Sequence, residues 1–133
     1  MKLAMHKGDS EKFSIKKRIK SFGYAFKGIR DFLFTTHNAW IHITVAILVV
    51  IAGFYFHISV IEWIGIVLSI GMVLSAEALN TAVEDWVDLV QPEYNKKAGS
   101  IKDIAAGAVL LTAICATIIG LLIFVPKVMD MLA

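Results

Sequence analysis

The sequence predicts an all-α integral membrane protein, with an N-terminal amphipathic surface helix followed by three transmembrane helices. Of its 133 residues, 58% are hydrophobic, and the formal net charge at pH 7 is only +2. A soluble domain of this size has a smaller apolar fraction, so the composition indicates a membrane protein. Nine of the 13 lysines and arginines precede residue 31, which leaves long uncharged runs further on. We expect one domain over residues 1–133.

The N-terminal part is polar and basic. Residues 1–12 are expected to form a frayed tail, and residues 13–34 a helix with apolar side chains every three or four positions. Lysines and Arg30 hold much of the opposite side of that helix. A basic amphipathic helix of this kind lies in the anionic headgroup layer of a membrane. Its apolar positions are Ile15, Ile19, Phe22, Phe26 and Ile29.

Three apolar stretches follow, each about long enough to cross a hydrocarbon core of roughly 30 Å. They are expected as helices over 38–56, 60–90 and 103–125. At 1.5 Å per residue the second helix is roughly 45 Å long, which is more than the core needs. Its acidic end must therefore reach the headgroups or water.

Prolines mark the expected ends of the last two spans. Gln91-Pro92 ends the second span, residues 92–101 form a polar loop, and Pro126 stops the third span. The lysines of this loop and the basic N-terminal segment are expected on the cytoplasmic side by the positive-inside rule, with the C-terminus outside. The acidic end of the second span then faces the cytoplasm.

A stripe of polar side chains follows hydrophobic sequence on the second span. Counted from Glu77, its members fall three, four, seven and eleven positions on, so all lie on one side of the helix. A carboxylate at the centre of a bilayer costs roughly 2.5–3.5 kcal/mol even on the gentlest scale, so it needs a partner or a function. A helix leaving the membrane with solvated acids explains Glu77 poorly. The stripe consists of Glu77, Asn80, Thr81, Glu84 and Asp88.

A second stripe, made of small residues, runs down another face of the same helix. Small faces let membrane helices approach closely. Because three short spans cannot enclose a deep polar site alone, we expect a homo-oligomer. The small residues are Gly71, Ser75, Ala78 and Ala82, with Ala106, Ala113, Ala116 and Gly120 on the third span.

The polar stripe resembles the signature of the small prokaryotic diacylglycerol kinase family, which is Glu-x-x-Asn-Ser/Thr-Ala-x-Glu followed by Asp. Order and spacing hold without gaps over roughly residues 15–125. The family also includes undecaprenol kinases, and its members are trimers of three-span subunits with the active site between subunits. The other matching segments are Gly23 to Arg30, Glu93-Tyr94 and Lys102-Asp103.

The resemblance implies an ATP-dependent lipid kinase of the bacterial inner membrane. It implies Mg²⁺, ATP as co-substrate, a lipid alcohol as substrate, a homotrimer with a cytoplasmic active site, and no nucleic-acid partner. Diacylglycerol is the expected substrate and undecaprenol the alternative. Glu77 is implied as the general base supported by Asn80, and Glu84 as a magnesium ligand. The implied nucleotide-binding residues are Lys17, Tyr24, Glu93, Lys102 and Asp103, with Thr81 and Asp88 as supporting residues.

One segment departs from the family pattern. Members usually carry Glu-x-Asn-x-x-Ile-His before the first span, and that Glu is a second metal ligand. Here Thr36 takes the Glu position, although Asn38, Ile41 and His42 match, and Trp40 stands where relatives often have Arg. A hydroxyl binds a metal ion only weakly. A degenerate family member that binds nucleotide or lipid without catalysis is therefore a second interpretation.

Interpretations from other classes are a small proton-relaying transporter and a non-catalytic membrane protein. Against a transporter, the acids cluster at one membrane side and the Lys102-Asp103 pair would have no role. The sequence has no Gly-x-x-x-x-Gly-Lys-Ser/Thr loop, which argues against a P-loop enzyme. The kinase interpretation agrees with the chemistry, because Mg²⁺ is commonly held by one or two carboxylates plus substrate phosphates.

Overall fold

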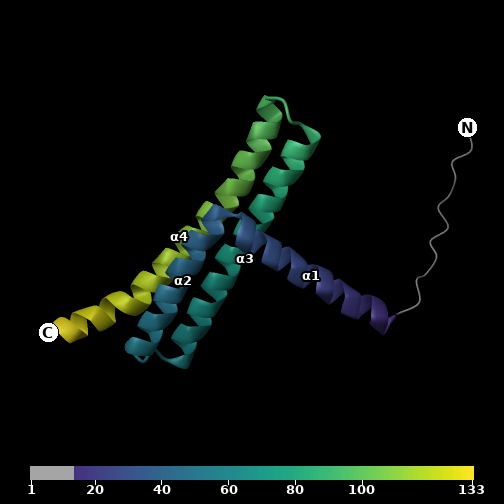
Figure 1. The fold of residues 1–133 in the computed structure, drawn as a ribbon. Helices are drawn as coiled ribbons and strands as arrows, with labels where there is room; N and C mark the ends of the chain where they lie inside the picture. Colours follow the sequence, from purple (N-terminus) through teal and green to yellow (C-terminus); the bar gives the residue numbers. More distant parts are fainter. Residues whose placement is uncertain (1–13) are drawn as a thin grey trace, which may run out of the picture.

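A computed structural model describes residues 14–133 as an arrangement of four α-helices (Figure 1). The expected frayed tail over 1–12 lies outside the described residues. No strand occurs within 14–133, so the all-α prediction is confirmed there. By length and composition, the last three helices are able to cross a membrane. The helices are α1 (Ile15–Thr35), α2 (His37–Tyr55), α3 (Val60–Val90) and α4 (Lys96–Leu132).

Helix α1 projects away from the other three helices (Figure 1). It begins at Ile15 because the Ser14 side chain caps it, accepting a hydrogen bond of 3.5 Å from the backbone N–H of Lys17. Every residue of α1 except Phe32 and Leu33 is exposed. The helix therefore covers little of its own chain, and its position on a membrane surface stays a prediction.

A short joint turns the chain from α2 back into α3. His57 has a φ of 50°, a left-handed conformation that is uncommon for residues other than glycine. Ser59 and Glu62 then form a capping box. The Ser59 hydroxyl accepts from the Glu62 N–H at 3.3 Å, and the Glu62 carboxylate accepts from the Ser59 N–H at 2.6 Å. This cap fixes the start of α3, whose bounds agree with the predicted 60–90.

Helix α4 begins earlier than the sequence predicted. The Asn95 side chain accepts hydrogen bonds from the backbone N–H groups of Lys97 and Ala98, at 2.9 Å and 3.3 Å. This cap starts the helix at Lys96. The prediction of a polar loop over 92–101 is therefore wrong from Lys96 onward, where the chain is helical.

Pro126 does not stop α4, which continues to Leu132. The prediction that the third helix ends near residue 125 is therefore wrong, while the point at which it leaves the membrane stays a prediction. A proline removes one backbone N–H donor and strains the preceding turn, but a helix can continue past it with a bend. Membrane helices tolerate such a proline, since neighbouring helices compensate for the freed backbone groups.

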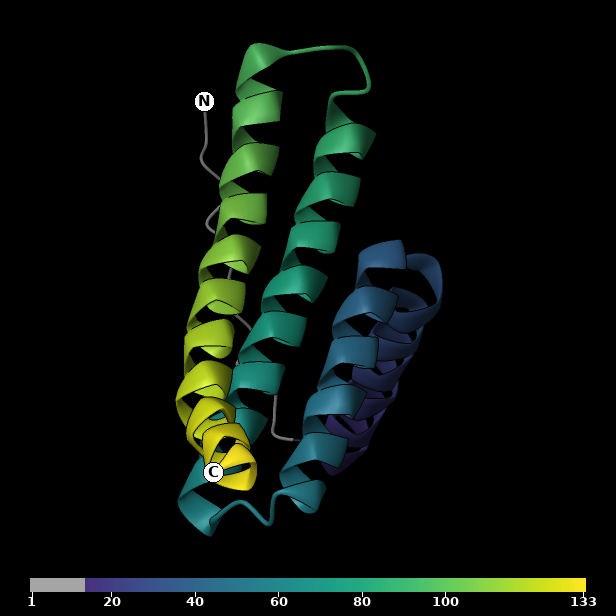
Figure 2. The same ribbon diagram turned by 90° about the vertical axis from the view of Figure 1, so that its left-hand side faces the viewer.

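The packing leaves one end of the α3–α4 pair uncovered. Helix α4 lies beside α3 over most of its length, whereas α2 lies beside the half of α3 nearer Val60 (Figure 2). A Cβ on Gly53 would lie 2.7 Å from the ring of Trp63, so this glycine permits the close approach of α2 and α3. The ends of α3 and α4 near residues 90–96 extend beyond α2, where water-soluble ligands can reach them.

The small buried core lies at the end of the molecule where α2 turns into α3. Ile58, Ile66 and Ile123 are buried together there, and Lys127 pairs with Glu62 at 3.1 Å between α4 and α3.

Two members of the small-residue stripe, Gly71 and Gly120, do not serve close packing between helices of the described chain. A Cβ on Gly71 or Gly120 would meet no described atom within 4 Å. The homo-oligomer stays a prediction.

Candidate active site

Glu77 is a buried carboxylate in the interior of α3. Its exposed fraction is only 2%. Its Oε2 lies 3.8 Å from Nε2 of His42 on α2, and its Oε1 has no hydrogen-bond partner among the described residues. Burying a polar group without a partner is costly, and burying a charge costs more. A solvated helix end does not account for this carboxylate, so Glu77 stays the candidate around which the other predicted site residues are placed.

Asn80 and Thr81 lie one turn further along α3. The Asn80 side-chain N–H donates to Oε1 of Glu84 at 3.0 Å, while its own Oδ1 is buried and has no partner within the described chain. The Thr81 hydroxyl donates to the backbone carbonyl of Glu77 at 3.0 Å. Within one chain, these side chains therefore orient Glu84 and the backbone, and neither holds the Glu77 carboxylate.

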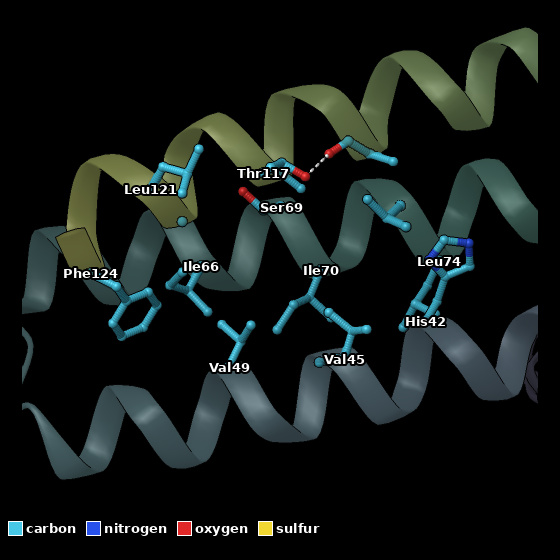
Figure 3. Close-up of a pocket in the computed structure, with 15 residues that line it drawn as sticks. His42, Val45, Val49, Ile66, Ser69, Ile70, Leu74, Thr117, Leu121 and Phe124 are labelled. Atoms are coloured by element: carbon cyan, nitrogen blue, oxygen red, sulfur yellow. Dashed lines mark hydrogen bonds between the residues drawn. The ribbon is translucent and has the colours of Figure 1, made fainter. Parts of the chain in front are cut away.

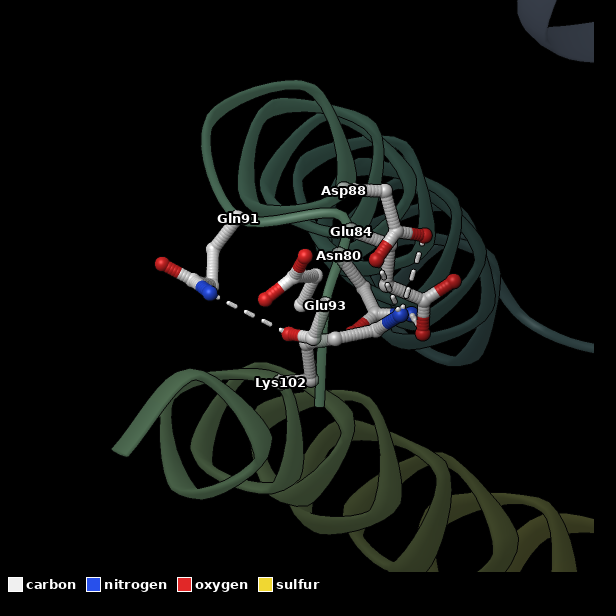
Figure 4. A network of polar contacts seen from close by, with 6 residues as sticks. All are labelled: Asn80, Glu84, Asp88, Gln91, Glu93 and Lys102. Atoms are coloured by element: carbon white, nitrogen blue, oxygen red, sulfur yellow. Dashed lines mark hydrogen bonds and ion pairs between the residues drawn. The ribbon is translucent and has the colours of Figure 1, made fainter. Parts of the chain in front are cut away.

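Lys102 reaches across from α4 to the acidic face of α3. Its Nζ lies 2.9 Å and 3.0 Å from the two carboxylate oxygens of Asp88. Figure 4 shows Lys102 beside Asn80, Glu84 and Asp88, with Glu93 on the segment that joins the two helices. The Glu93 backbone carbonyl accepts a bond of 3.3 Å from Gln91. The structure thus brings residues from α3, α4 and their joint into one polar cluster.

Other predicted site residues lie elsewhere in the single chain. Lys17 and Tyr24 are on α1, which points away from the α3–α4 end that carries the cluster (Figure 1). Tyr24 is 63% exposed, with Lys20 Nζ 5.8 Å from its ring centroid. Asp103 is exposed on α4 beside Lys102. Thr36 forms the junction of α1 and α2, where its side chain makes no capping hydrogen bond.

The donor set fits a magnesium ion that arrives with phosphates. Among residues 14–133, no three His, Cys, Asp or Glu side chains gather closely enough to hold a metal ion by themselves. Mg²⁺ usually needs only one or two protein carboxylates, because substrate phosphates and water complete its shell. Glu84 is half-buried and its Oε1 is fixed by Asn80. An ordered carboxylate of this kind is a suitable hard ligand.

An apolar groove of about 410 Å³ runs along α3 between α2 and α4 (Figure 3). His42 and Leu74 line one end, and Phe124 lines the other. The hydroxyl groups of Ser69 and Thr117 donate to carbonyls of their own helices, each at 2.8 Å. The groove therefore offers an apolar surface that leads to the side chain facing Glu77.

The sequence gives only a partial signal for His42. Ile41 and His42 match the family pattern, but this match does not show which side chain the imidazole of His42 faces. Its position against Glu77 depends on how α2 packs on α3, which helical periodicity does not reveal. The groove had no sequence signal of its own, because its lining is ordinary apolar and small residues.

Fold and cluster together define a helical, multi-pass membrane protein with an acidic site at one end of its longest helix pair. The sequence matches the prokaryotic diacylglycerol kinase family over residues 23–124. The chain therefore belongs to the prokaryotic diacylglycerol kinase family, as its signature residues predicted.

Three relatives show the range of that similarity. The chain is 43% identical to an undecaprenol kinase of Bacillus subtilis (strain 168) over 108 residues, covering 81% of this chain and 88% of that protein. It is 37% identical to a diacylglycerol kinase of Synechocystis sp. over 113 residues, covering 84% and 65%. It is 33% identical to a diacylglycerol kinase of Escherichia coli (strain K12) over 108 residues, covering 75% and 82%.

Proposed function

We propose that this protein is an ATP-dependent kinase that transfers the γ-phosphate of MgATP to the hydroxyl group of a membrane lipid. The observation that carries the proposal is Glu77, a carboxylate only 2% exposed with one oxygen unpartnered in the described chain. Such a group suits a base that takes a proton from a lipid hydroxyl. The lysine distribution supports a cytoplasmic active site in a bacterial cell membrane.

Phosphoryl transfer depends mostly on positioning and charge stabilisation. Glu77 accepts the proton of the lipid hydroxyl as the hydroxyl oxygen bonds to the γ-phosphorus. The bond between the γ-phosphorus and the bridging oxygen breaks, and ADP leaves with the electron pair. Glu84 would hold the magnesium ion that accompanies ATP, and that ion, when bound, offsets charge on the phosphate oxygens. Asn80 keeps Glu84 in place.

The nucleotide is proposed to lie over the cluster at the α3–α4 end. Lys102 leaves Asp88 and supplies positive charge to the phosphates, while Glu93 and Asp103 contact the rest of the nucleotide. Because α1 points away from this end, Lys17 and Tyr24 would reach it only from the α1 helix of another copy (Figure 1). This arrangement supports a homo-oligomer whose sites each use two chains, and the family resemblance implies that it is a trimer.

The lipid alcohol is proposed to be undecaprenol, ahead of the diacylglycerol that we first expected. The 43% identity to an undecaprenol kinase exceeds the 37% and 33% identities to two diacylglycerol kinases. Diacylglycerol remains the second candidate.

Transfer of labelled phosphate from ATP to each lipid, measured side by side in detergent micelles, tests the proposal. We expect label in undecaprenyl phosphate, with a smaller amount in phosphatidic acid. Larger transfer to diacylglycerol would reverse the substrate order. Absence of label in both lipids, from a protein that still binds MgATP, would support the degenerate interpretation instead.

A further inference from the structure

His42 is the ionisable side chain that faces the Glu77 carboxylate in the described structure. Its Nε2 lies 3.8 Å from Oε2 of Glu77, and the two side chains come from different helices. The exposed fractions differ sharply, at 24% for His42 and 2% for Glu77. The imidazole therefore lies between the enclosed carboxylate and the more open side of the groove.

The polar neighbours of Glu77 on α3 do not hold its carboxylate. Asn80 donates to Glu84, and the Thr81 hydroxyl donates to the Glu77 backbone carbonyl. Apart from the packing that buries Glu77, the contact that bears on its carboxylate is the 3.8 Å approach of His42 from α2, which is longer than a hydrogen bond. A catalytic base must be held in place, since a misplacement of about 1 Å can cost about 100-fold in rate.

We infer that His42 is a positioning residue that fixes the Glu77 carboxylate at the head of the apolar groove. The inference rests on the proposed kinase function. His42 lines the groove as well as facing Glu77, so a lipid chain in the groove brings its hydroxyl to the pair (Figure 3). The proton still passes from the lipid hydroxyl to Glu77, and His42 exchanges no atom with the substrate.

Two substitutions of His42 separate the positioning role of the imidazole from the space that its ring fills. His42→Leu keeps an apolar side chain of useful size but removes the ring nitrogen, and should lower kcat about 100-fold with both KM values unchanged. In His42→Gln an amide N–H can reach the place of Nε2, so this variant should recover part of kcat. The matched control is His57→Asn at the distant joint, where asparagine tolerates the positive φ and kcat should not change.

A second measurement does not depend on turnover. Dicyclohexylcarbodiimide, an apolar reagent, modifies carboxyl groups in apolar surroundings, and mass spectrometry of the α3 peptide reports modification of Glu77. Loss of the imidazole frees the carboxyl group, so modification should be faster in His42→Leu than in the wild type. Glu77→Gln gives the background.

The outcomes are distinguishable. A wild-type chain that phosphorylates no lipid, yet shows the faster modification in His42→Leu, retains the positioning role and refutes the kinase function. An active wild type with unchanged kcat and unchanged modification in His42→Leu overturns the positioning role. A loss of activity in His42→Leu that arises only from a higher KM also overturns it. If His42→Leu fails to fold, His42→Met, which also lacks the ring nitrogen, decides by the same two measurements.

Discussion

Lys102 on α4 contacts both carboxylate oxygens of Asp88 on α3, at 2.9 Å and 3.0 Å. The two side chains are 34% and 65% exposed, so solvent screens the pair and it adds little to stability. The pair places the Lys102 ammonium group beside Glu84 (Figure 4). A phosphate group can replace the Asp88 carboxylate, because both are oxygen anions that an ammonium group binds.

Lys102→Met should lower kcat/KM for ATP by about 100-fold, because it removes a positive charge where charge develops on the phosphates. The unfolding free energy should change by less than about 1 kcal/mol, as expected for an exposed pair. Steady-state kinetics with ATP as the varied substrate give the first value. Lys97→Met is the matched control, since its side chain is exposed on the first turn of the same helix. Equal losses in the two variants would remove Lys102 from the site.

Glu77→Gln should lower lipid phosphorylation by a factor of about 10²–10⁴ while ATP affinity is retained, because the amide keeps the shape but accepts no proton. Phosphate transfer and nucleotide binding are measured on the same preparation. Glu62→Gln is the control on the same helix, where it lies at the opposite end and keeps a side chain able to complete the capping box. Near-normal turnover in Glu77→Gln would exclude Glu77 as the base.

Thr36→Glu should lower the magnesium concentration needed for half-maximal activity, because it adds a hard oxygen donor at the family position. The substitution removes no capping hydrogen bond, because the Thr36 side chain makes none at the start of α2. Thr35→Glu is the control one residue away on α1. If the wild type is inactive and Thr36→Glu restores turnover, the chain is a degenerate kinase. If the substitution lowers both activity and magnesium affinity, another residue already fills this role.

The direction of the chain in the membrane is tested by single cysteines at positions 97 and 133, introduced after Cys115→Ser. The positive-inside rule predicts that Lys97 is cytoplasmic and Ala133 is outside. A membrane-impermeant thiol reagent added to intact cells or to inverted vesicles should label one site in each preparation. Labelling of both sites from one side would contradict the three-span topology.

The sequence correctly predicted features that depend on a single helix. The shared face of Glu77 and Glu84 follows from helical spacing, and the end of α3 follows from Pro92. It failed at the start of α4, because the Asn95 side chain caps the helix within a stretch whose composition is typical of a loop, and at Pro126, which the helix tolerates. The contact of His42 with Glu77 depends on packing between helices, so spacing along the chain could not reveal it.

Gly120→Leu tests whether the groove holds the lipid chain. Gly120 lines the groove, and a Cβ there meets nothing within 4 Å apart from the adjoining turns of its own helix, so a side chain at this position starts toward open space. Leucine also favours a helix over glycine by up to about 1 kcal/mol, so a loss of helix stability is not expected. We expect a higher KM for the lipid and an unchanged KM for ATP.

The matched control for the groove is Gly107→Leu on the same helix. A Cβ at Gly107 also meets no described atom within 4 Å, and this residue does not line the groove. Gly120→Ala should give an intermediate effect, because its side chain fills less of the groove. An unchanged lipid KM in Gly120→Leu, with ATP kinetics intact, would show that the hydrocarbon chain lies elsewhere. Equal effects of Gly120→Leu and Gly107→Leu would indicate a general disturbance of α4 and would also count against the groove as the lipid site.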